Sequence, residues 1–303
     1  MLLLLAALIA ALASFATGNG EVHRLVLAPG DTVVATSEGY GESIVFVPGL
    51  IGNSYGFRKV APALADSGYH TLIVEPLGTG NSSRPRRADY TLEAQARRVA
   101  DAMDRLGVSS AYFVCHSVGA SICLRLALSE PTRVRGILSI NGGPDERAGT
   151  AGLKTAIRLA PLLKLLGAGR IIRGKVKGGL ENNSADRSWI TTEALAAYTA
   201  PFRDFGAALG TFRAMGEAVE PDSLIPRLPL VRAPVLLLAG TGARGGGPAP
   251  DAVEILARGL ARFTADTVRN AGQYIHEEQP DSVVAAVQRL VRGNGERVPD
   301  GAP

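Results

Sequence analysis

The chain has 303 residues, of which 46% are hydrophobic and 20% are charged. Its 32 Lys and Arg residues exceed its 28 Asp and Glu residues, for a net charge of +4. This small excess argues against a general nucleic-acid binder, and the apolar content is ample for one α/β domain with an insertion. The only cysteines, Cys115 and Cys123, favour neither a disulfide framework nor a zinc site. We expect both to be small buried residues.

The N-terminal segment is apolar. Residues 2–16 form an unbroken run of apolar or small residues, and the first charged side chain is Glu21. A buried core helix is disfavoured, because it would be apolar on every face. A membrane span needs ~20 residues, and a secretory signal usually has basic residues ahead of its apolar core. We therefore predict that residues 1–20 are either a retained membrane anchor or a cleaved export signal.

The remaining chain alternates between strand patterns and helix patterns. We expect strands over residues 24–27, 32–36, 43–47, 70–74, 111–115, 134–140, 235–239 and 264–268. We expect helices over residues 57–67, 92–106, 117–129 and 281–292. Such alternation predicts an α/β fold in which helices flank a mostly parallel central sheet.

The strand pattern stops between Gly142 and Pro234, where several helices are expected instead. We predict an inserted helical lid over residues 143–234, which divides the α/β core into residues 21–142 and 235–293. The polar tail, 294–303, is expected to be disordered.

The predicted lid begins with a basic segment that has no acidic residue between positions 148 and 180. Leucines and isoleucines are interleaved with its basic residues, which are Lys154, Arg158, Lys164, Arg170, Arg173, Lys175 and Lys177. An apolar helix with basic flanks can lie on an anionic membrane surface. The alternative is an ordinary lid whose basic face is solvated.

Three short motifs follow expected strands. Residues 113–120 read FVCHSVGA, residues 46–53 read FVPGLIGN, and residues 75–82 read EPLGTGNS. In this order and spacing they resemble the nucleophile elbow, the oxyanion loop and the acidic-x-x-Gly-x-Gly-x-Ser turn of the α/β-hydrolase superfamily. The branch resembled is that of epoxide hydrolases, haloalkane dehalogenases and esterases. The resemblance covers about residues 43–292.

The resemblance implies a nucleophile position at Ser117. It also implies an oxyanion site formed by the backbone amides of Leu50 and Val118, with Gly49 beside them. An elbow serine sits in a strained turn between a strand and a helix, and the helix N-terminus faces the developing negative charge. The alternative is that Ser117 merely caps the helix. His116 is expected to pack beside the elbow, because neighbours in such a turn point apart.

The same resemblance places the catalytic histidine at Gln273 and the catalytic acid at Ala243. Glutamine forms hydrogen bonds but cannot act as a base near neutral pH. Some relatives carry the acid after the preceding strand, where this chain has Asn141. His276 is a candidate substitute base, although a loop or helix-start residue without catalytic role is the favoured interpretation.

Two functions remain open from the sequence. The favoured one is a protein without ordinary serine-hydrolase activity that binds a small apolar ligand or serves as a subunit of a membrane-protein complex. The alternative is a hydrolase of small apolar esters or lactones that uses Ser117 with a non-standard base. Neither function requires a metal or a cofactor, and no nucleic-acid partner is expected.

Overall fold

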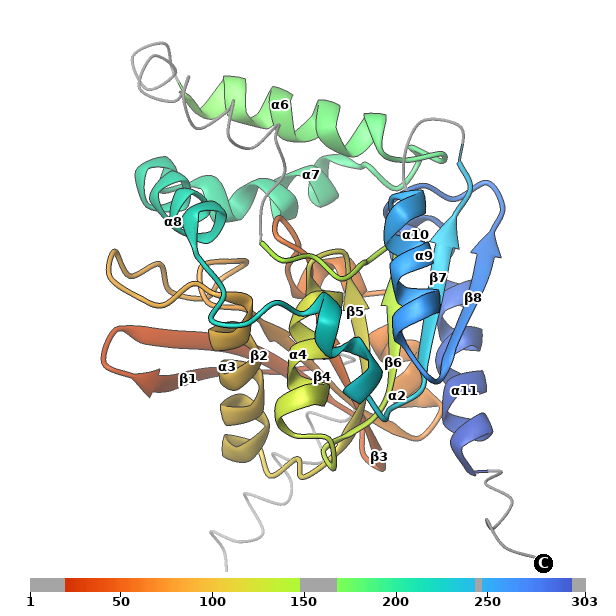
Figure 1. The fold of residues 1–303 in the computed structure, drawn as a ribbon. Helices are drawn as coiled ribbons and strands as arrows, with labels where there is room; N and C mark the ends of the chain where they lie inside the picture. The colour runs from red at the N-terminus through yellow and green to blue at the C-terminus, as the bar shows by residue number, and fades with distance from the viewer. Residues whose placement is uncertain (1–19, 148–167, 243–246, 296–303) are drawn as a thin grey trace, which may run out of the picture.

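The computed structural model describes residues 20–147, 168–242 and 247–295. Within them, eight strands form one sheet in the order β1-β2-β4-β3-β5-β6-β7-β8 (Figure 1). The strands are β1 (Glu21–Ala28), β2 (Asp31–Glu38), β3 (Glu42–Val47), β4 (Tyr69–Glu75), β5 (Ala111–His116), β6 (Val134–Ile140), β7 (Val235–Gly240) and β8 (Phe263–Val268). Only the β1–β2 and β2–β4 pairs are antiparallel. The predicted mostly parallel sheet is confirmed.

Apolar layers cover both faces of the sheet. Strand β5 is buried along its whole length, as expected for a central parallel strand. Because side chains alternate along a strand, Phe113 points into one core layer and Tyr112 into the other. Helices α3 (Leu92–Arg105), α4 (Gly119–Ser129) and α9 (Pro250–Gly259) contribute to the first layer. Helices α2 (Ala61–Asp66), α10 (Ile275–Glu278) and α11 (Pro280–Gly295) contribute to the second.

Two helix predictions need correction. Residues 57–67 do not form one helix: a 3-10 turn, η1 (Ser54–Phe57), precedes the shorter α2. Proline is favoured in the first turn of a helix, and Pro62 lies there in α2. Helix α9 was not anticipated at all. The final helix, α11, runs through Gly295 into the first residues of the predicted disordered tail, and residues 296–303 lie outside the described part.

The prediction for the two cysteines was wrong. Cys115 and Cys123 are buried, but they form a disulfide. Cys115 lies near the end of β5, and the sharp turn after the strand folds α4 back against it. The Cα atoms are therefore 6.8 Å apart, within the range that a disulfide spans. The sequence separation did not reveal this proximity, because it depends on the turn.

The segment between β6 and β7 contains the predicted additional helices. They are α6 (Ala168–Asn182), α7 (Thr192–Thr199), η2 (Ala200–Phe202), α8 (Phe205–Glu217) and η3 (Ile225–Leu230). We call this segment the insertion. Helices α6, α7 and α8 lie above the carboxyl ends of the central strands (Figure 1). Residues 148–167, which carry Lys154, Arg158 and Lys164, lie outside the described residues, as do residues 1–19. None of the described helices combines the length and the apolarity that crossing a membrane requires.

A buried arginine on α4 binds acidic residues that lie before α6 and after α8 of the insertion. The Arg125 side chain on α4 is only 4% exposed. It pairs with Glu146 at the start of the insertion, at 3.1 Å, and with Glu220 after α8, at 3.3 Å. Glu220 also accepts a hydrogen bond from the backbone amide of Leu92, at the start of α3. Buried charges are tolerated when they are paired in this way. These contacts hold the chain at Glu146 against α4, and the chain at Glu220 against α3 and α4.

Candidate functional site

Ser117 lies in a strained turn between β5 and α4. Its φ angle is +52°, in the left-handed region that non-glycine residues rarely adopt. Glycines let the flanking segments approach closely. A Cβ atom at Gly119 would lie 2.4 Å from the carbonyl oxygen of Val47, and one at Gly142 would lie 2.5 Å from that of Ser117. The turn therefore has the backbone geometry of an elbow that presents a serine.

The predicted oxyanion amides belong to Leu50, in the loop after β3, and to Val118, at the start of α4. Neither amide donates a hydrogen bond to another described residue. Gly49 packs directly against the elbow, since a Cβ atom there would lie 3.2 Å from Cβ of Ser117. These groups retain the arrangement that could stabilise an oxyanion.

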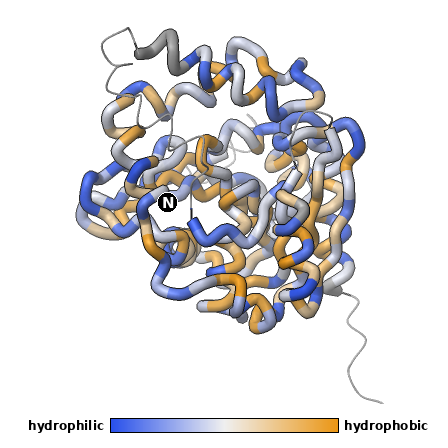
Figure 2. The backbone as a smooth tube through the Cα atoms, turned by 45° about the horizontal axis from the view of Figure 1, so that its top comes forward, coloured by the Kyte–Doolittle hydropathy of each residue, from blue (hydrophilic) through white to orange (hydrophobic). Residues whose placement is uncertain are grey.

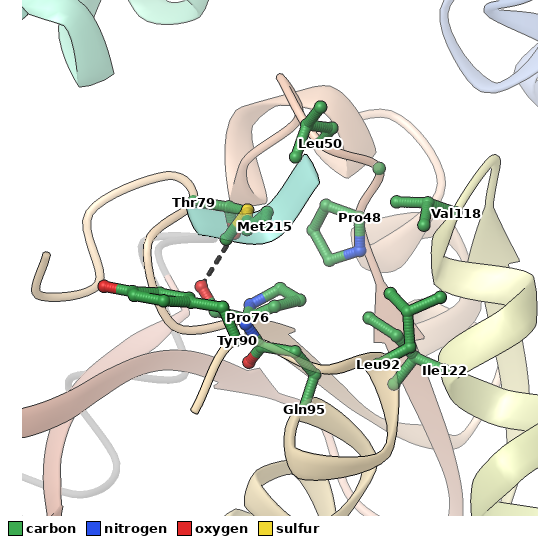
Figure 3. Close-up of a pocket in the computed structure, with 11 residues that line it drawn as sticks. Pro48, Leu50, Pro76, Thr79, Tyr90, Leu92, Gln95, Val118, Ile122 and Met215 are labelled. Carbon is green, nitrogen blue, oxygen red and sulfur yellow. Dashed lines mark hydrogen bonds between the residues drawn. The ribbon is translucent and has the colours of Figure 1, made fainter. Parts of the chain in front are cut away.

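A narrow apolar cavity adjoins the oxyanion amides. Its walls include Pro48, Leu50 and Val118, with Met215 of α8 opposite (Figure 3). Its volume is about 10 Å³. That is roughly the space one water needs, so a larger molecule requires movement of the side chains that line it.

Gln273 occupies a loop whose backbone is held on two sides. Its amide donates to the carbonyl of Asn183 in the insertion, at 2.7 Å. Its carbonyl accepts from Nε2 of His116, at 3.0 Å, and from Nδ2 of Asn141, at 3.1 Å. Among the described residues, no hydrogen bond joins its side chain to Ser117. The structure therefore shows Gln273 as part of a packed junction between the core and the insertion.

Asn141 has a structural function at the place where some relatives carry the acid. It adopts a φ of +48°, and its amide nitrogen donates to the carbonyls of Gly272 and Gln273. Its Oδ1 accepts from the amide of Gly240. A carboxylate could not donate these two bonds. Ala243, at the other acid position, lies outside the described residues.

His276 is buried in a stack of rings. Its imidazole lies 4.5 Å from that of His116 and 4.9 Å from the ring of Phe57, measured between centroids. Its Nε2 faces Gly56, while its Nδ1 is fully buried and makes no hydrogen bond to a described residue. Within the described residues, its ring contacts are with Phe57, His116 and Tyr274, and none is with Ser117. Its suggested function as a substitute base stays a prediction.

Burial keeps both imidazoles neutral. It lowers the pKa of His116 to about 4, although the hydrogen bond to a carbonyl acts in the opposite direction. It lowers the pKa of His276 well below its ordinary value, and the nearby His116, Arg58 and Lys59 add to the decrease. Desolvation disfavours the charged form of a histidine. The pair thus contributes neutral rings to the packing at neutral pH.

Sequence reasoning assigned no function to Glu75, which is fully buried. Its carboxylate accepts hydrogen bonds from the amides of Ser54, at 2.8 Å, and Asn81. It therefore joins the segment after the oxyanion loop to the turn after β4. A Cβ atom on Gly80 would collide with this carboxylate, at 2.3 Å, which explains the glycine in the 75–82 motif.

The insertion is attached to the Gln273 loop by a second carboxylate. Glu278 accepts hydrogen bonds from the amide of Gly272 and from those of Ala185 and Asp186, at 2.8–3.0 Å. The ring of Trp189 lies 5.3 Å from that of Tyr274.

No group of three or more His, Cys, Asp or Glu side chains suited to a metal occurs in the described ranges.

Comparisons with known proteins agree with this geometry. A family profile described as "alpha/beta hydrolase fold" matches residues 42–158. The structure of Cfl2 from Burkholderia cenocepacia aligns with 90% of this chain and 96% of its own, with a TM-score of 0.75 at 24% identity. The chain therefore has the α/β-hydrolase fold.

Two curated relatives of this chain align with it over very different shares of its length. Lipase 3 of Moraxella sp. (strain TA144) is 36% identical over 120 residues, which are 39% of this chain and 38% of the lipase. The chain thus matches well under half of that lipase's length. The magnesium-chelatase 30 kDa subunit of Rhodobacter capsulatus is 28% identical over 270 residues, which are 86% of this chain and 90% of the subunit.

We expect acid to destabilise this protein through His116. The unfolded chain takes up the histidine proton near pH 6.5, whereas the folded chain does so only near pH 4. Stability is therefore fully present above pH 6.5 and decreases as the pH falls to 4, by up to about 3 kcal/mol. His116→Gln should reduce this slope, and the buried His276 should account for part of the slope that remains. The free energy of unfolding, measured with urea from about pH 7.5 to about pH 4, tests this prediction, because that range spans both pKa values.

The control is Ser117→Ala, which changes the residue next to His116 and removes no group that titrates in this range. This variant should keep the parent's pH dependence. An unchanged slope in the His116→Gln variant would contradict the assignment.

Proposed function

We propose that this α/β-hydrolase-fold protein lacks ordinary serine-hydrolase activity and acts as a ligand-binding protein or as a subunit of a membrane-held complex. The observation that carries the proposal is Gln273 at the position of the catalytic base. Its backbone is bonded to His116, Asn141 and Asn183, so this loop contributes to packing.

A serine hydroxyl is a weak nucleophile unless a base accepts its proton. The amide of Gln273 is not basic, and the nearby imidazoles of His116 and His276 are buried bases with lowered pKa values. Neither has a recorded hydrogen bond to Ser117 among the described residues. This supports the loss of triad chemistry.

The extent of the alignments favours a subunit over a lipase. The relative that aligns over most of both chains is named as a subunit of a magnesium chelatase. The lipase aligns over less than half of either chain. We therefore infer that this chain, too, works as part of an assembly.

The cavity at the oxyanion amides favours a small apolar ligand, if one binds there. Its lining is almost entirely apolar, and it includes Leu50, Val118 and Met215 (Figure 3). A volume of about 10 Å³ leaves no room for a bulky acyl chain without rearrangement.

A fluorophosphonate probe should label Ser117 slowly. Loss of a triad base reduces the rate by several orders of magnitude, so labelling at neutral pH should take hours under conditions in which an intact serine hydrolase reacts within about a minute. Mass spectrometry of the peptide that contains Ser117 measures it, with Ser117→Ala as the control. Rapid stoichiometric labelling that the control abolishes would show an efficient base and overturn the proposal.

A second candidate function is a slow hydrolase of small apolar esters or lactones. The strained φ of Ser117 and the unbonded amides of Leu50 and Val118 favour it. Strain of this kind is retained only where the surroundings enforce it, often at functional sites.

We also propose that the protein is held at a membrane or exported. The apolar residues 1–20 support both locations. The Cys115–Cys123 disulfide favours export, because disulfides persist in oxidising compartments. On α6, Arg173, Lys175 and Lys177 are exposed, and hydrophilic residues alternate with hydrophobic ones along this helix (Figure 2).

Deleting residues 1–20 should leave partial binding to anionic vesicles, and added salt should abolish it. A basic residue near an anionic surface contributes roughly 1 kcal/mol, and salt screens this attraction. The full-length chain should resist the same salt. Vesicle co-sedimentation measures both, with the charge-removing variant Arg173→Gln/Lys175→Gln/Lys177→Gln and neutral vesicles as controls. If the truncated chain ignores anionic vesicles at low salt, the basic residues are only a solvated face.

A further inference from the structure

His116 has one ring nitrogen whose function the packing does not explain. Its Nε2 lies 3.0 Å from the carbonyl oxygen of Gln273. A carbonyl only accepts hydrogen bonds, so Nε2 carries the proton and the lone pair of the neutral ring is at Nδ1. No described residue forms a hydrogen bond with that nitrogen.

Nδ1 of His116 and the side chain of Ser117 border the same small space. A Cβ atom built on Gly49 would lie 3.0 Å from Nδ1 and 3.2 Å from Cβ of Ser117. Because Gly49 has no side chain, nothing from this residue separates the two groups. The cavity that Gly49 lines together with Leu50 and Val118 adjoins this space and has room for about one water.

We propose that Nδ1 of His116 accepts the proton of Ser117 and that the chain thereby retains a slow acyl-transfer reaction with small acyl esters. This inference rests on the second candidate function, the slow hydrolysis of small esters, and names the base that would serve it. The Gln273 carbonyl orients the imidazole and fixes its tautomer, a task that a carboxylate performs in a triad.

The reaction balances with groups that the chain provides. Oγ of Ser117 attacks the ester carbonyl carbon while its proton passes to Nδ1 of His116, directly or through one water. The amides of Leu50 and Val118 hold the oxyanion. The tetrahedral intermediate collapses, the alkoxide leaves with the proton from Nδ1, and an acyl-serine remains. Water then hydrolyses the acyl-serine by the same proton path.

The surroundings of His116 explain why the reaction is slow. Burial lowers the pKa of this imidazole to about 4, so it is a weak proton acceptor. His276 and Tyr274 pack against the ring, and the charges of Arg58 and Lys59 act on His276. The base is nevertheless unprotonated throughout the neutral range. The rate should therefore be level from about pH 6 to 8 and fall only in acid.

The test uses the full chain and p-nitrophenyl acetate, with acetylation of Ser117 followed by mass spectrometry. His116→Gln retains an amide nitrogen that can donate to the Gln273 carbonyl, but it has no basic nitrogen that could accept the proton of Ser117. We expect this variant to acetylate at least about tenfold more slowly. The control, His23→Gln, changes a partly exposed histidine on β1 and should stay within about twofold of the parent.

An unchanged rate in the His116→Gln variant would overturn the inference, and so would an equal loss in both histidine variants. A parent rate that increases about tenfold per pH unit between pH 6 and 8, without a plateau, would also overturn it, because such a profile indicates hydroxide as the base. The parent's pH profile is a test even if the variant does not fold. Acetylation at the rate of an intact triad enzyme would instead overturn the proposed function.

Discussion

The structure around the site depends on the turn at Ser117, where β5 ends and α4 begins. A left-handed backbone at a serine is unfavourable by itself. It persists because Gly119 and Gly142 allow carbonyl oxygens to approach within distances that any side chain would block. The disulfide between Cys115 and Cys123 spans the same turn and adds a covalent constraint. The backbone that presents the serine and frees the Val118 amide is therefore retained.

Amide residues in the loops around the elbow serve as structural supports. Gln273 and Asn141 are amides at positions where the superfamily resemblance places a base and a possible acid. An amide both donates and accepts hydrogen bonds without titrating near neutral pH. Asn141 uses this capacity to connect the ends of β6 and β7 with the Gln273 loop. His116 connects the same loop to β5. Amides at these two positions favour a rigid junction between the core and the insertion, and they do not act as bases.

Much of the fold could be predicted from the sequence because apolar residues predominate in the central strands. The β6 prediction, residues 134–140, agrees with the observed strand to the residue. The assignment of Gln273 to the position of the triad base depends only on spacing from a recognisable motif, and it stays a prediction. The position of α9 was missed, and the 57–67 helix was predicted too long.

Contacts between distant segments were not visible in the sequence. The partner of Cys115 is determined by the direction in which α4 leaves the turn, and the tautomer of His116 by a carbonyl 157 positions further along the chain. The function of Glu75 likewise depends on amides from two loops that meet only in the folded protein. Local patterns specify elements, whereas these interactions depend on how the elements are placed together.

We propose that a competent serine elbow and oxyanion site remain in a chain whose base and acid positions hold Gln273 and Ala243. The most direct test is to restore both in the variant Gln273→His/Ala243→Asp and to measure kcat/KM for p-nitrophenyl acetate. We predict an increase of at least about tenfold over the parent, and a smaller increase for Gln273→His alone, because that histidine lacks an acid to fix its tautomer. A folded double variant with no more activity than the parent would contradict the claim, because the remaining elbow and oxyanion site would then not be competent for catalysis.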